Sequence, residues 1–364
     1  MKEHLPRLSG QDWIIVVWHE GLPIDLPNRY IRKIAPKNFD WEDEGCQVKH
    51  RQATILSHRL PFSQDMFLLG PMRRTYNEVK NALGGTPDLV WTVTLSSAIL
   101  WNWFDSRELI NTPFFLQEHS NPLSMHLNKK YKLKAARSLV KRMKKVIVVA
   151  ERQIQEFTDL SEGYNCEVIS NPVDPTFLKN TITTPTNKSI IYVGRLSWEK
   201  GLQRLIMASR LILKKEPLLK VNIVGYGELE QELRQMVSDY QLESVVNFMG
   251  PKTADEIAFI LGENEIFVLP SYYENCPVSL LEAQVKGVPC LVTNNGASEK
   301  VLLTGNGISL DDDGSGKQLA EGVRRLLNQS REYNRKEIRQ RALKKFAPAV
   351  FAENFYSSFK EVMG

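Results

Sequence analysis

The sequence predicts an α/β protein with two domains, each built on an open parallel β-sheet, which face each other across a cleft. The first observation is a regular alternation of short apolar runs with longer amphipathic segments, which is typical of βαβ units. The second is a turn with two prolines, SNPVDPTF at residues 170–177, between the two halves. The third is a length of 364 residues with 42% hydrophobic and 24% charged residues, which suits two globular domains.

The alternation is clearest in the C-terminal half. Apolar runs predict strands at 189–194, 220–225, 245–250, 266–270 and 288–293. Amphipathic segments predict helices at 200–215, 228–240, 253–262 and 277–286. The N-terminal half follows the same rhythm less clearly, with predicted strands WIIVVW, ATILS, DLVWTV, PFFLQ and KVIVV.

Composition and charge exclude several classes of protein. No run approaches the roughly 18 apolar residues of a membrane span, and the N-terminus lacks the apolar core of a secretory signal. The net charge of +5 is too weak to indicate nucleic acid binding. The four cysteines, Cys46, Cys166, Cys276 and Cys290, have no metal-ligand spacing, so reduced thiols in a cytoplasmic protein are the simplest interpretation.

Two glutamates, Glu274 and Glu282, flank the start of a predicted helix in SYYENCPVSLLEAQVKG. Glu274 follows a predicted strand, and ligands of open parallel sheets bind beyond the carboxyl ends of the strands. The backbone N–H groups of Asn275, Cys276 and Val278 are predicted to be free for an anion or a polar ligand group. Each glutamate alone also fits a surface acid, so the prediction of a binding site depends on the two together.

A second cluster lies in YVGRLSWEKG, where Arg195 and Lys200 flank another predicted strand end. A guanidinium fork beside an ammonium suits a diphosphate, although two surface cations are a common alternative. Gly194, and Gly225 in IVGYGELE, allow a ligand to approach the backbone closely. IVGYGELE is a poor dinucleotide motif, because Glu230 replaces the third glycine.

These motifs occur together and in order, and with them the chain resembles glycosyltransferase family 4, the retaining nucleotide-sugar transferases of the GT-B fold. The resemblance rests on VGRLSWEKG, IVGYGELE, NFMG, ENCPVSLLE and EAQVKGVPCLV, and covers roughly residues 110–362. It implies two Rossmann-like domains, an acceptor domain at 1–172 and a donor domain at 173–346. It also implies a final helix at about 347–364 that packs back on the N-terminal domain.

The resemblance implies a role for each residue of the two clusters. Arg195 and Lys200 hold the donor diphosphate. Glu282 binds the ribose hydroxyls and Glu274 binds the hydroxyls of the donor sugar. The N–H groups that follow Glu274 contact this sugar and the phosphate.

The family places a histidine at the strand end QEHS, where it faces the donor sugar, which implies this role for His119. His19, after the first predicted strand, is a weaker candidate. One departure concerns the loop HEGLPIDLPNRY at 19–30, which has one glycine where family members usually carry a pair. Acceptor binding by that loop is therefore not carried over to this chain.

The implied reaction is a hexosyl-type transfer from a UDP- or GDP-sugar to a glycan, a lipid-linked acceptor or another hydroxyl, in polysaccharide or glycoconjugate synthesis. The leaving phosphate takes the acceptor proton, so no protein base, cofactor or metal is expected. The run DDDG at 311–314 invites a metal interpretation, since paired aspartates bind divalent ions. Its place between a predicted strand and a predicted helix favours a turn instead.

Other functions remain open on the same fold. A sugar-nucleotide epimerase or a phosphorylase would use a similar donor cleft, since fold does not fix function. A non-catalytic nucleotide-binding module is the alternative from another class, and it would bind nucleotide without turnover. An NAD-dependent oxidoreductase is disfavoured by the missing third glycine.

The segment KKYKLKAARSLVKRMKK at 129–145 contains nine basic residues and no acid. We predict one helix with an apolar stripe of Leu133, Ala136, Val140 and Met143. A core-packing helix with a solvated cationic face is favoured over peripheral contact with an anionic membrane.

Overall fold

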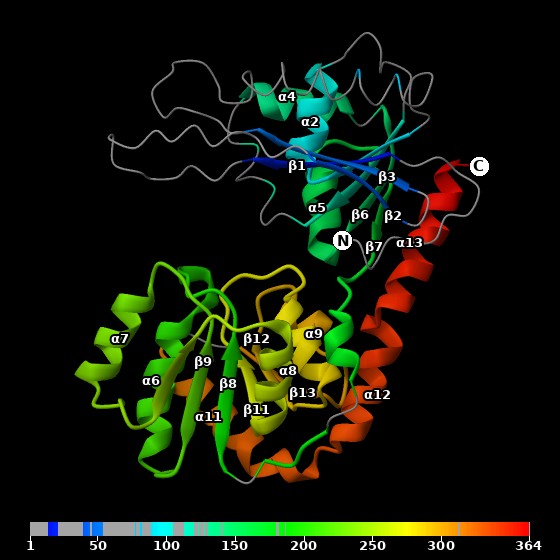
Figure 1. The fold of residues 1–364 in the computed structure, drawn as a ribbon. Helices are drawn as coiled ribbons and strands as arrows, with labels where there is room; N and C mark the ends of the chain where they lie inside the picture. Colours follow the sequence, from blue (N-terminus) through cyan, green and yellow to red (C-terminus); the bar gives the residue numbers. More distant parts are fainter. Residues whose placement is uncertain are drawn as a thin grey trace.

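The computed structural model describes residues 14–20, 39–43, 46–53, 77, 81, 89–104, 113–119, 123, 127, 130–139, 141–179, 182–185, 187–311 and 314–363. For the stretches between 14 and 53 it describes the backbone of the strands alone. The chain forms an N-terminal part and a C-terminal part, one above the other in Figure 1, each with its own parallel sheet.

The C-terminal sheet has six parallel strands in the order β10-β9-β8-β11-β12-β13. Its strands are β8 (Ser189–Val193), β9 (Lys220–Val224), β10 (Val246–Gly250), β11 (Ile266–Leu269), β12 (Cys290–Thr293) and β13 (Gly307–Leu310). Its helices are η3 (Trp198–Lys200), α6 (Leu202–Leu213), α7 (Glu230–Asp239), α8 (Ala254–Glu263), α9 (Val278–Val285), α10 (Ser298–Val301), α11 (Lys317–Gln329), η4 (Ser330–Glu332) and α12 (Arg335–Phe346). The predicted alternation of strands and helices is confirmed in this half.

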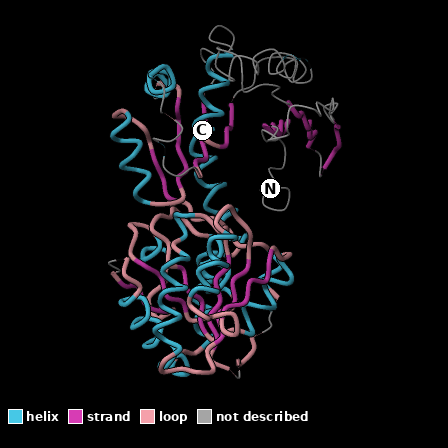
Figure 2. The backbone as a smooth tube through the Cα atoms, turned by 90° about the vertical axis from the view of Figure 1, so that its left-hand side faces the viewer, coloured by secondary structure: helices cyan, strands magenta, loops and turns pink. Residues whose placement is uncertain are grey.

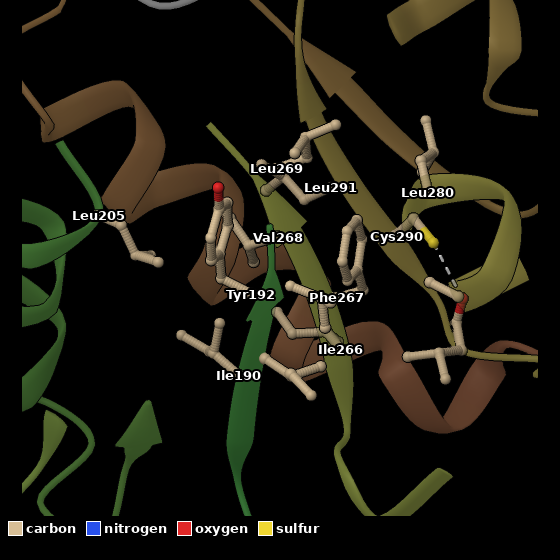
Figure 3. Close-up of a cluster of buried hydrophobic side chains, with 14 of the residues drawn as sticks. Ile190, Tyr192, Leu205, Ile266, Phe267, Val268, Leu269, Leu280, Cys290 and Leu291 are labelled. Carbon is tan, nitrogen blue, oxygen red and sulfur yellow. Dashed lines mark hydrogen bonds between the residues drawn. The ribbon is translucent and has the colours of Figure 1, made fainter. Parts of the chain in front are cut away.

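Helices lie on both faces of this sheet (Figure 2). The central strands are therefore apolar on both faces, and all residues of β8, β11 and β12 are buried. Figure 3 shows Ile190, Tyr192, Phe267 and Leu291 packed together in this core. Sheet order places β8 beside β11 although β9 and β10 come between them in sequence, so the loops that follow β8 and β11 lie next to each other.

The described N-terminal strands form two sheets. The first is parallel, in the order β4-β5-β6-β7, with β4 (Val90–Val93), β5 (Phe114–Glu118), β6 (Met143–Val148) and β7 (Cys166–Val168). The second is mixed, in the order β1-β3-β2, with β1 (Ile14–Glu20), β3 (Cys46–Ala53) and β2 (Phe39–Asp43). The antiparallel pair β2–β3 was not predicted, because its polar residues interrupt any apolar run.

The prediction of one helix over residues 129–145 is wrong. Helix α4 (Lys130–Leu139) ends before Met143, which is the first residue of β6. The prediction failed because it treated Lys145 as a cation on the surface of a helix. Lys145 is instead buried within β6, where its Nζ lies 2.7 Å from Glu361 and 2.9 Å from Glu167. A paired cation in a strand cannot be told from a helix-surface cation by the charge pattern alone. Leu133 and Ala136 do pack inward, whereas Val140 lies outside the described residues.

Among the described residues, three further helices cover the N-terminal part or join it to the C-terminal part. They are α2 (Leu95–Phe104), α5 (Glu151–Leu160) and α13 (Pro348–Met363), while the short helix η2 (Pro175–Leu178) follows the linker. Figure 1 shows α13 running from the C-terminal part up to the N-terminal sheet. There Phe355 and Phe359 lie 5.3 and 5.6 Å from the Phe115 ring of β5. The domain limits at 172 and 346 stay a prediction.

Candidate active site

The candidate site lies beyond the carboxyl ends of β8, β9 and β11, on the edge of the sheet that faces the N-terminal part (Figure 1). Two loops form its floor, residues 194–201 after β8 and residues 270–277 after β11. The backbone N–H of Tyr272 donates to the carbonyl of Glu199 over 2.8 Å. This hydrogen bond joins the loops, so the two predicted clusters belong to one site.

The centre of this floor is an ion pair between Lys200 and Glu274. Lys200 Nζ lies 2.7 Å from Glu274 Oε1, and Ser271 Oγ donates to the same oxygen over 2.8 Å. The Glu274 residue is only 5% exposed, which makes Lys200 the cation that compensates a buried carboxylate. The structure therefore brings a predicted sugar-binding acid and a predicted phosphate-binding cation into direct contact.

Arg195 occupies a different environment at the rim of the site. Its side chain is 69% exposed, and its Nε lies 3.6 Å from Glu228 Oε2. The hydroxyl of Tyr192 donates to the Arg195 carbonyl over 2.7 Å and fixes the backbone beneath it. An exposed, loosely paired guanidinium can turn towards an anion at little cost.

Gly194 and Gly225 have a packing role that the sequence did not reveal. Gly225 has a φ of +135°, and a Cβ at this position would lie 1.8 Å from the Gly194 carbonyl oxygen. The loops after β8 and β9 therefore need glycine in order to pass each other. Close approach of a ligand to these glycines stays a prediction.

The N-terminus of α9 supplies unbonded backbone donors beside Glu274. Pro277 is the N-cap of α9, directly before Val278, the first residue of the helix. Within the described residues, the N–H groups of Cys276 and Val278 donate to no protein acceptor. Burial raises the pKa of the Cys276 thiol to about 11, so the thiol stays protonated at neutral pH and the backbone is the polar group this residue offers.

Glu282 lies on α9, near the carboxylate of Asp174 in the linker. Burial, and to a smaller extent Asp174, raise the pKa of Glu282 from 4.5 to about 8. No hydrogen bond or ion pair within the described part of the chain joins its carboxyl to Lys200 or Glu274. A half-buried carboxyl that is paired with neither of them is suited to a ligand that donates hydrogen bonds, such as a diol.

His119 follows directly after β5, at the carboxyl end of that strand of the N-terminal sheet. Part of its surface is exposed, yet the surrounding protein removes enough water to lower the pKa of the imidazole. Glu118 and a hydrogen bond with Asn171 oppose that shift. The imidazole is therefore largely neutral at pH 7. For His19 the structure describes the backbone of β1 alone, and most of the 19–30 loop lies outside the described residues.

Sequence reasoning missed several residues around the site. Arg152 of α5 donates from Nε to Asn275 Oδ1 over 2.8 Å, and its guanidinium lies 3.5 Å above the Tyr273 ring. Asn171 of the linker donates from Nδ2 to the Cys276 carbonyl over 3.2 Å. Tyr273 could have been suspected from its place beside Glu274. Arg152 and Asn171 are distant in sequence and carried no local signal.

The acidic run at 311–314 is described only in part. Asp311 accepts a hydrogen bond of 2.6 Å from Asn294 Nδ2, whereas residues 312 and 313 lie outside the described residues. In the described part of the chain, no three His, Cys, Asp or Glu side chains lie together in a way that could hold a metal ion. The rejection of a metal at this run stays a prediction.

A family profile described as Glycosyl transferases group 1 matches residues 175–345, which contain every site residue predicted in the C-terminal half. This part of the chain is similar to that family. The chain as a whole has the GT-B fold, since it superposes on Anabaena HepE in complex with UDP with a TM-score of 0.69. That comparison covers 86% of this chain and 86% of HepE at 18% sequence identity, so it speaks for the fold alone.

Two curated relatives are similar in sequence. An uncharacterised glycosyltransferase of Haemophilus influenzae is 29% identical over 191 residues, 52% of this chain and 53% of the relative. The amylovoran biosynthesis glycosyltransferase AmsK of Erwinia amylovora is 32% identical over 143 residues, 38% of this chain and 35% of the relative. The chain thus spans about a third to a half of the length of these two relatives. No helix in its described part is long and apolar enough to cross a membrane.

Proposed function

We propose that this protein is a retaining glycosyltransferase of family 4, which transfers a hexose-type sugar from a nucleoside diphosphate to a hydroxyl acceptor. The observation that carries the proposal is the Lys200–Glu274 pair beside the unbonded N–H groups of α9. A nucleotide-sugar presents an anionic diphosphate next to neutral hydroxyls. The floor presents a cation and a helix N-terminus, which suit the diphosphate, next to a carboxylate, which suits the hydroxyls. Arg195 adds a second cation at the diphosphate, and Glu282 binds the ribose.

In the proposed reaction, the bond between the anomeric carbon and the diphosphate oxygen breaks, and a bond to the acceptor oxygen forms on the same face. The acceptor proton passes to the leaving phosphate, so the protein supplies no base. Lys200, Arg195 and the N–H groups of Cys276 and Val278 stabilise the charge that develops on the leaving group. No metal and no cofactor take part.

The donor and the acceptor are proposed from the relatives. HepE binds UDP, which supports a UDP-sugar as the first donor to test, with GDP-sugars second. AmsK is named for amylovoran biosynthesis, which supports a role in polysaccharide synthesis. We further propose a glycan or lipid-linked acceptor and a cytoplasmic location, peripheral to the inner face of the membrane. We expect no nucleic acid partner.

A panel of UDP- and GDP-sugars tests the proposal, with melting temperature and slow donor hydrolysis as readouts. The matching donor at about 100 times its dissociation constant should stabilise the protein by roughly 2.7 kcal/mol and be hydrolysed. Hydrolysis should persist in EDTA. Stabilisation without any turnover would favour a non-catalytic binding module, and interconversion of two nucleotide-sugars would favour an epimerase.

The acceptor proposal includes peripheral contact with an anionic membrane through residues 129–145. Lys130, Lys134, Lys141 and Lys144 are exposed on this segment, whereas Arg137 donates to the Leu160 carbonyl over 3.1 Å. Each free cation near an anionic surface contributes about 1 kcal/mol. We expect flotation with anionic vesicles at low salt, release at high salt, and loss of binding when the four lysines are changed to glutamine. Protein that does not bind the vesicles at low salt would refute the membrane contact and favour a soluble acceptor.

A further inference from the structure

Two separate hydrogen-bonded connections join the His119 side of the site to the loop that carries Glu274. The first passes through Asn171, in the linker between the two halves. Its Nδ2 donates to the Cys276 carbonyl over 3.2 Å, and its amide bonds the His119 ring. Ser170 and the Asn171 backbone also approach the Cys276 thiol. One linker residue therefore contacts both sides of the site.

The second connection passes through α5 of the N-terminal part. Glu156 Oε2 accepts from the Leu123 backbone N–H over 3.0 Å, four residues beyond His119 in the chain. Glu156 Oε1 lies 3.4 Å from the Tyr273 hydroxyl, which donates to it. Arg152, one turn earlier on α5, covers the Tyr273 ring and bonds Asn275. Both residues that flank Glu274 are thus held by α5.

We propose that Asn171 and Arg152 are positioning residues, which set His119 and the donor-sugar loop in register across the two halves of the active site. The proposal rests on the proposed function for its catalytic consequence. Neither residue needs to touch the reacting atoms, because each acts on a group that is assigned to the donor sugar.

The orientation of the Asn171 amide bears on which nitrogen of the His119 ring carries the proton. Asn171 Nδ2 uses one of its two hydrogens for the Cys276 carbonyl, which turns the amide so that Oδ1 is available as an acceptor for the His119 ring. With Oδ1 as the acceptor, the neutral ring carries its proton on the nitrogen that faces Asn171, and its other nitrogen is an acceptor. A change in the angle between the two halves would break this contact, so the histidine is set correctly only when the linker and the loop are in place.

The test uses Asn171→Ala, Asn171→Asp and Arg152→Met in the full chain. The matched control is Lys300→Ala, which removes an exposed ion pair of 2.7 Å between Lys300 and Glu151 of the same helix α5. This pair also crosses between the two halves but touches no predicted site residue. Melting temperatures report which variants are folded.

The first readout is the pKa of His119, measured by NMR of the labelled ring and assigned with His119→Gln. Asn171→Ala should lower this pKa, because it removes the acceptor that favours the charged ring. Asn171→Asp should raise it, because a carboxylate replaces that acceptor beside Glu118. The fall in Asn171→Ala is the result that reports the hydrogen bond, because the new carboxylate of Asn171→Asp would raise the pKa through space even without direct contact. An unchanged His119 pKa in Asn171→Ala would overturn the role of Asn171.

The second readout is turnover of the matching nucleotide-sugar. Asn171→Ala and Arg152→Met should lower kcat about 10- to 100-fold, as expected for a small displacement of reacting groups. The donor dissociation constant should stay within about threefold of wild type, since the contacts that bind the ground state and the transition state equally are unchanged. Lys300→Ala should keep wild-type kcat. An equal loss of kcat in Lys300→Ala would show that loss of any contact between the two halves lowers turnover, and it would refute the proposal. If the wild-type protein turns over no donor, the proposed function fails, while the titration of His119 still decides the contact.

Discussion

Lys200→Met should destabilise the folded protein by about 3 kcal/mol, because it leaves the buried Glu274 carboxylate without its cation. It should also weaken donor binding about 100-fold, since a charge-assisted contact with the diphosphate is lost. Urea unfolding at neutral pH measures the first effect, and calorimetric titration with the matching nucleotide-sugar measures the second. The two effects share one residue because the free protein uses Lys200 to neutralise Glu274 and the complex uses it for the donor.

Two variants separate these effects. Lys200→Met combined with Glu274→Gln should recover most of the lost stability, since the neutral amide needs no cation, but should not recover donor binding. Arg195→Ala removes an exposed pair of 3.6 Å, so stability should change by at most about 1 kcal/mol, while donor binding still falls. Unchanged donor affinity in both single cation variants would refute the phosphate assignment. An unchanged urea midpoint in Lys200→Met would show that the buried pair contributes nothing to stability.

The sequence was informative where local pattern and tertiary structure coincide. Central strands such as β8 and β11 are buried on both faces, so their apolar runs stand out from the amphipathic helices that cover them. Glu274 and Lys200 each follow such a strand within a few residues. Placement of both at one edge of the sheet then follows from parallel topology alone.

Prediction failed where a residue takes its role from distant partners. Lys145 reads as one more surface cation until Glu361, from the far end of the chain, is seen beside it. Arg152 and Asn171 likewise acquire their roles from Asn275 and Cys276, more than 100 residues away. A charge pattern in one segment does not contain these contacts, which form only when α5 and the linker meet the C-terminal part.

Glu282→Gln should remove a pH dependence of stability that the wild-type protein shows between about pH 4.5 and pH 8. Burial raises the pKa of Glu282 from 4.5 to about 8, so within this window the folded protein keeps a proton that the unfolded chain releases. Stability then falls as pH rises, by at most about 1.4 kcal/mol per pH unit, and levels off above the folded pKa. The free energy of unfolding, measured for both proteins from pH 5 to 9, should therefore fall with rising pH in the wild type more than in the glutamine variant.

Donor binding should show the opposite trend with pH if Glu282 contacts the ribose. An ionised carboxylate accepts two hydroxyl hydrogen bonds, so wild-type affinity should rise as the pH passes through about 8, and Glu282→Gln should bind weakly at every pH. Glu274→Gln serves as the contrast, because contacts with the reacting sugar should lower kcat more than donor affinity. A wild-type stability that parallels the glutamine variant would mean that Glu282 is already ionised in the folded protein, and the ribose would then meet a charged carboxylate from neutral pH upward.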